Sequence, residues 1–205
     1  MERKVFIEGK NKSEQAYIGW ESEELYLIGV KDGYKSSADD LLDKAILEGH
    51  KNRIDILDKY IFPIMFLYRH SIEISLKLIY RRVNGKIPTG HNLMTLWDRV
   101  DKDVLNLLNN DIKLKKLEEK YNTKIYRLNI DKKLLNEIKN LIKELQGIDS
   151  NGDVWRYLIN KNGDLYFNKW KFIDYPNLKN TINYIYEFLD GLYCEVDEIL
   201  VVRKS

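Results

Sequence analysis

The longest hydrophobic pattern in the chain runs from Tyr60 to Tyr80. Its apolar side chains recur on nearly every side of a helical projection, which predicts a helix buried all round. Four charged or titratable residues interrupt it, Arg69, His70, Glu73 and Lys77, and at about 100° per residue they share roughly a quarter of the circumference. Burying an unpaired charge is costly. We therefore expect this polar stripe either to lock helices together through ion pairs or to face a site that a ligand completes.

Helical periodicity dominates the rest of the chain. Asn84-Gly85 is a stop signal for the central helix, and Thr89-Gly90-His91-Asn92 is a start signal for the next one. Pro63 has no amide hydrogen to donate, so it predicts a kink or a later start of the central helix. Predicted helices cover about 37–49, 53–84, 93–107, 111–121, 131–147, and 178–192 or beyond.

Short β-favouring runs, among them Leu25–Ile28, predict an irregular or β N-terminal arm over residues 1–35. Farther along, two such runs flank a turn rich in Asn and Gly, which predicts a β-hairpin inserted near 153–168. The remainder, 36–205, is predicted to be a helical bundle. The expected fold class is therefore mainly α, an up-and-down helical bundle with a small β-hairpin element.

Composition narrows the class of protein. The 205 residues are 44% hydrophobic and suit one sizeable domain. Thirty-four basic residues nearly balance 32 acidic ones, so the net charge gives no sign of a nucleic-acid binder. A local basic patch is still compatible with this balance. The single Cys194 excludes an intramolecular disulfide and fits a reducing compartment. With no long apolar segment, we expect a cytoplasmic protein with no membrane association.

Arg69, Glu73 and Lys77 stand four residues apart in succession, so they can form an internal ion-pair ladder. The same spacing suits a ligand-facing site, since ionisable groups with perturbed pKa values occur both in structural ion-pair networks and in functional sites. His70 is adjacent in angle to Lys77. It is either a hydrogen-bonded core residue or the titrating member of the stripe.

His91 lies at the start of the helix that follows the central one. A helix N-terminus lowers the pKa of an imidazole and offers free amide donors to an anion such as phosphate. The alternative is that Thr89 or Asn92 caps the helix and His91 is simply exposed.

Arg156 stands between Trp155 and Tyr157, where it can stack on or pair with a nucleotide. It can equally pair with Asp149 or Asp153. The chain has no phosphate-binding glycine loop, dinucleotide fingerprint, zinc motif or serine-hydrolase elbow. We therefore expect no cofactor and no metal site.

The run Phe66–Ile79 with its Arg-His, Glu and Lys, followed by Gly90–Leu93 and Leu96-Trp97, resembles helical proteins of the HEPN superfamily. Trp155–Tyr157 resembles an aromatic-Arg-Tyr element of such bacterial proteins. The likeness spans about residues 38–192. It implies a helical bundle, often a homodimer, in a superfamily linked to bacterial immunity, toxin–antitoxin systems and RNA cleavage.

The ribonuclease motif of that superfamily, an Arg separated from a His by four to six residues, is absent from this chain. Two hypotheses therefore stand. The chain binds RNA or a nucleotide between the helices of Arg69 and His91, with or without metal-independent RNA cleavage, in nucleic-acid-related defence or stress. Alternatively, it is a non-catalytic module for protein interaction or dimerisation. The candidate catalytic residues are Arg69, His70 and His91, and the candidate ligand-binding residues are Glu73, Lys77, Asn92 and Arg156.

Overall fold

The computed structural model describes residues 5–19, 21–121, 124–125, 130–169 and 171–201. Over these ranges the chain is mainly helical, which confirms the predicted class, and contains no β-strand. The elements are a short 3-10 turn η1 (Lys12–Glu14), α1 (Glu23–Gly49), α2 (Ile54–Asn84), α3 (Leu93–Val100), a π-helical turn η2 (Asp101–Leu105), α4 (Asn106–Leu108), α5 (Asp111–Tyr121), α6 (Lys132–Ile148) and α7 (Tyr175–Val201).

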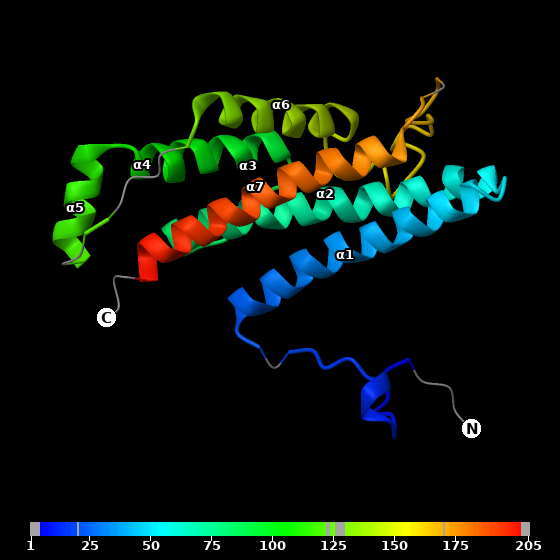
Figure 1. The fold of residues 1–205 in the computed structure, drawn as a ribbon, viewed down its shortest axis with the longest axis horizontal. Coiled ribbons are helices and arrows are strands. Elements are labelled where there is room, and N and C mark those ends of the chain that lie inside the picture. The colour runs from blue at the N-terminus through cyan, green and yellow to red at the C-terminus, as the bar shows by residue number, and fades with distance from the viewer. Residues whose placement is uncertain (1–4, 20, 122–123, 126–129, 170, 202–205) are drawn as a thin grey trace.

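The central element is α2, which packs against α1, α3, η2 and α7. Figure 1 shows α1 beside α2, α7 lying across α2, and α3 and α6 stacked away from α1. Six consecutive residues of α2, 71–76, are buried, so the prediction of a helix enclosed on all sides is confirmed. No helix of the described ranges combines the length and apolar character needed to cross a membrane.

The ends of α2 follow local signals. Gly85 adopts a left-handed conformation with φ of 72° and donates its amide to the Arg81 carbonyl at 2.7 Å, as the stop signal predicts. The start lies at Ile54, and Pro63 is inside the helix, so the option of a later start is wrong. Because Pro63 and Lys59 are exposed, water can reach the carbonyl that Pro63 leaves without a donor.

The predicted start of the first helix near residue 37 is wrong, because α1 already begins at Glu23 and includes Leu25–Ile28. Ser22 caps this end by accepting the Leu25 amide at 3.4 Å. Lys31 and Lys35 are buried and donate to side chains of α7, which holds the N-terminal half of α1 in place. The arm before it is shorter than expected, and residues 5–19 are almost wholly exposed.

The predicted β-hairpin is not supported. It is reduced to one isolated antiparallel bridge between Ile159 and Leu165. The reason lies just before it, where the Asp153 carbonyl accepts the amides of both Arg156 and Tyr157, at 3.1 and 2.8 Å. A chain that turns on itself in this way cannot run extended as the first strand of a hairpin.

Candidate functional site

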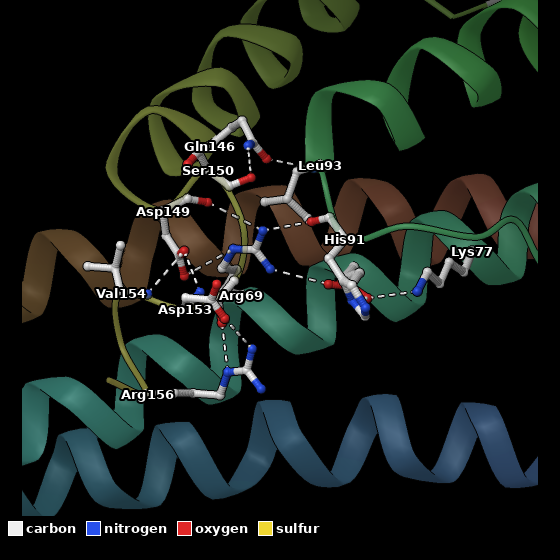
Figure 2. Close-up of polar contacts among 12 residues, drawn as sticks. Arg69, Lys77, His91, Leu93, Gln146, Asp149, Ser150, Asp153, Val154 and Arg156 are labelled. Atoms are coloured by element: carbon white, nitrogen blue, oxygen red, sulfur yellow. Dashed lines mark hydrogen bonds and ion pairs between the residues drawn. The ribbon is translucent and has the colours of Figure 1, made fainter. Parts of the chain in front are cut away.

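The polar stripe of α2 points into the protein, as both alternatives require. Arg69 is 4% exposed and Glu73 is 2% exposed. Arg69 Nη1 lies 3.2 Å from Glu73 Oε2, and Lys77 Nζ lies 2.8 Å from Glu73 Oε1, so the ion-pair ladder expected from the spacing is present (Figure 2). The Glu73 carboxylate thus pairs with two cations of its own helix.

Arg69 also reaches beyond its helix. Its Nη2 donates to the carbonyls of His91 at 2.7 Å and Asp149 at 3.4 Å, and its Nε lies 3.4 Å from Asp149 Oδ2. Asp149 is 1% exposed, so this second ion pair is also buried. A single guanidinium therefore connects α2 to His91, two positions before α3, and to Asp149, the residue after α6.

Asp149 in turn shapes the segment that follows α6. Its Oδ1 accepts the amides of Asp153 at 2.8 Å and Val154 at 3.3 Å. Gly152 lies between Asp149 and Asp153 in the sequence and has φ of 77°. A Cβ at this position would lie 3.0 Å from Arg69 Nη1. This position needs glycine both for its backbone conformation and for the close approach of Arg69.

Side chains secure the start of α3 from two directions. Asn92 Oδ1 accepts the Thr95 amide at 2.9 Å, so Asn92 is the helix cap, one of the two caps weighed from the sequence. Gln146 Oε1 accepts the Leu93 amide at 2.7 Å, and its Nε2 donates to the Ser150 carbonyl at 2.6 Å. The loop that carries His91 is therefore held against α6.

His91 and Glu73 form a hydrogen-bonded pair. His91 Nδ1 lies 2.9 Å from Glu73 Oε1, while the His91 side chain is 66% exposed. Burial would raise the pKa of Glu73, but the hydrogen bonds from Lys77 and His91 outweigh it and hold that pKa below its usual 4.5. An ionised carboxylate only accepts hydrogen bonds, so Nδ1 of a neutral His91 carries the hydrogen and Nε2 keeps a free lone pair.

His70 lies in an aromatic environment. Its ring stacks on Phe66, with 5.7 Å between centroids, and meets the edge of Tyr34 at 4.9 Å. Burial lowers the pKa of His70 below 6.5, nearby cations including Lys77 lower it further, and only Glu73 opposes them. At neutral pH this imidazole is mostly uncharged.

These groups border a small cavity of about 120 Å³. Arg156 closes one side of it, with Nη2 2.7 Å from Asp153 Oδ1 and Nε donating to the Gly152 carbonyl at 2.7 Å. Of the two carboxylates weighed as partners from the sequence, Arg156 pairs with Asp153. The lining residues are Phe66, Arg69, His70, Glu73, His91, Asn151, Gly152 and Arg156.

The structure thus brings together five of the seven predicted site residues around the cavity. Lys77 is connected to it only through Glu73, and the Asn92 side chain is directed to its own helix. Positive and negative side chains balance around the cavity, so its affinity for an anion depends on the partly exposed guanidinium of Arg156. The charged groups are Arg69, Lys77 and Arg156 against Glu73, Asp149 and Asp153.

Sequence reasoning missed Gln146 and Gly152 as site residues and considered Asp149 only as a partner of Arg156. The run of Asp, Ser, Asn, Gly and Asp over 149–153 is a turn signal. It indicates where the chain bends. It does not indicate that Arg69, eighty positions earlier, fits into the bend.

No known protein family, curated protein or solved structure matches this chain. Within the described ranges, no three or more His, Cys, Asp and Glu side chains gather in a way that would hold a metal ion.

Proposed function

We propose that this chain is a HEPN-like helical protein that binds a phosphate group of RNA or of a nucleotide in the cavity between His91 and Arg156. The observation that carries the proposal is the exposed His91 imidazole, oriented by the buried Glu73 carboxylate at the edge of a polar cavity. At about 120 Å³ the cavity suits one phosphate group, being well below the roughly 300–1,000 Å³ of sites that enclose a whole drug-sized ligand.

The same arrangement suits metal-independent RNA cleavage. His91 Nε2 takes the proton of the 2′-hydroxyl, and the 2′ oxygen attacks the adjacent phosphorus. The bond from phosphorus to the 5′ oxygen breaks, and water supplies the proton for that leaving oxygen. Arg156 offsets the charge that develops on the phosphate oxygens. Arg69 acts through Asp149 and the His91 carbonyl, so its part is to position the two sides of the cavity.

The resemblance of Phe66–Ile79 and Gly90–Leu93 to HEPN proteins supports the same proposal and adds its setting, nucleic-acid-related bacterial defence or stress. Because the usual Arg and His spacing is absent, the pair formed by Glu73 and His91 takes the place of that motif in our proposal.

Binding is tested with a fluorescently labelled single-stranded RNA and with a labelled nucleotide, by anisotropy at low salt. We expect Arg156→Gln to weaken binding by about fivefold to tenfold and to reduce the salt dependence by roughly one phosphate contact. Arg53→Gln is the matched control, since Arg53 is an exposed cation paired with Asp55 at the start of α2. Absence of binding to either ligand between pH 6 and 7.5 would overturn the proposal.

Cleavage is tested with the same RNA in the presence of a metal chelator. We expect His91→Gln to slow cleavage by about a hundredfold or more while RNA affinity changes only a few-fold, because a general base contributes to the rate rather than to binding. His50→Gln is the control for loss of an imidazole elsewhere. If bound RNA stays intact in the wild type, the chain is a binding protein and the catalytic part of the proposal fails.

A second candidate, a non-catalytic interaction or homodimerisation module, is favoured by one observation. Arg69 pairs with both Glu73 and Asp149, as it would in a purely structural network. Light scattering at micromolar concentration measures the oligomeric state. A stable dimer or a protein partner, together with RNA affinity that neither His91→Gln nor Arg156→Gln changes, would favour this candidate.

A further inference from the structure

A second and larger cavity, of about 570 Å³, lies between α6, α7 and the segment that precedes α7. This volume is within the range of sites that enclose small organic molecules. Buried side chains from two helices form its floor, Met65 of α2 with Ile182 and Ile185 of α7. The floor therefore favours an apolar ligand surface.

One wall of this cavity is aromatic. The rings of Trp155 and Phe167 lie 5.2 Å apart between centroids, and Phe62 lies behind both at 6.2 and 6.4 Å. Phe172 at the rim is 91% exposed, which leaves a further ring available for contact. Aromatic rings in contact gain free energy from offset or edge-to-face geometry. The wall therefore suits a planar ring.

The rim carries three charged groups with different surroundings. Asp174 Oδ1 accepts the Asn177 amide at 2.7 Å and so caps α7. Lys171 Nζ lies 6.0 Å from the Phe167 ring centroid. Glu144 is exposed and has no ion pair within the described part of the chain. Two carboxylates, Glu144 and Asp174, thus stand against one cation, Lys171, so the formal charge of the rim is negative by one.

We propose that this cavity binds a planar aromatic molecule that carries a positive charge, with its ring against Trp155 and Phe167 and its charge toward Glu144. This ligand is distinct from the phosphate group of the proposed function, since the cavity floor is apolar and the rim carries two carboxylates against the single cation of Lys171. The two cavities are neighbours all the same. Met65 and Arg69 are one turn apart on α2, and Trp155 and Arg156 are consecutive.

The test uses the full chain and two fluorescent probes, proflavine as a planar aromatic cation and anilinonaphthalene sulfonate as an aromatic anion. We expect proflavine to bind with a Kd at least tenfold below that of the anion. Glu144→Gln should weaken proflavine binding by about threefold to tenfold, because it removes the charge and keeps the shape. Glu198→Gln is the matched control, about 20 Å farther along α7 than Ile185.

Asn177→Trp places a bulky side chain at the rim of the cavity, where Asn177 is exposed and the fold is not at risk. We expect this variant to abolish proflavine binding while its helical circular dichroism matches the wild type. Binding that survives Asn177→Trp would show that the probe lies elsewhere and would overturn the proposal. Equal affinity for the two probes, or an unchanged Kd in Glu144→Gln, would refute the charge preference.

Discussion

Replacing Arg69 by Met tests whether the buried ion pairs hold α2, α3 and the end of α6 together. The substitution keeps an unbranched side chain of similar reach but removes the cation that Glu73 and Asp149 share. Both carboxylates are almost completely buried, so each would lose a compensating charge in a place that water reaches poorly.

The size of the stability loss depends on the partners that Glu73 and Asp149 retain after Arg69 is replaced. Removing one partner of a buried pair costs about 3–5 kcal/mol. Glu73 retains Lys77 at 2.8 Å, and Asp149 retains the amides of Asp153 and Val154. We therefore expect the lower end of that range, about 3 kcal/mol of unfolding free energy.

Urea unfolding at pH 7, followed by far-ultraviolet circular dichroism and linear extrapolation, measures this loss. Arg156→Met is the matched control, because the pair of Arg156 and Asp153 is partly exposed and should contribute less than about 1 kcal/mol. If Arg69→Met costs no more than Arg156→Met, the buried network does not stabilise the fold and the reasoning fails.

Three further predictions concern His70, Asn92 and Gly152. The folded-state pKa of His70 lies below its unfolded value of 6.5. The stability that neutral His70 contributes is therefore present above pH 6.5 and is lost as the pH falls through the folded-state pKa. Between pH 7.5 and 5.5, the urea midpoint should drop less in His70→Asn than in the wild type. Asn92→Ala should cost about 1 kcal/mol in thermal unfolding and Asn92→Asp much less, because aspartate can still cap the Thr95 amide. Gly152→Ala should cost more than Gly163→Ala in urea unfolding, since both glycines have positive φ but only a Cβ at Gly152 meets Arg69; equal losses would contradict this.

Part of the fold was predictable because its signals are local. The buried central helix, its end at Gly85 and the start signal of the next helix follow from hydrophobic periodicity and from residues that satisfy a helix terminus within a few positions. The ladder of Arg69, Glu73 and Lys77 follows from the same helical geometry.

Other elements depended on distant segments. The β-favouring run Leu25–Ile28 is helical because α1 gains contacts with α7, through Lys31 for example, that no local propensity describes. The predicted hairpin is reduced to one bridge, because Asp149 accepts the Asp153 amide and the Asp153 carbonyl accepts the amides of Arg156 and Tyr157.

The sequence by itself determined the central helix, its end at Gly85 and the presence of charge inside it, since these depend on residues a few positions apart. Only the tertiary structure decided which groups neutralise that charge. Asp149 and the His91 carbonyl reach Arg69 because α3 and the end of α6 pack against α2 there. Contacts across such separations are set by how whole helices pack, which no local pattern encodes.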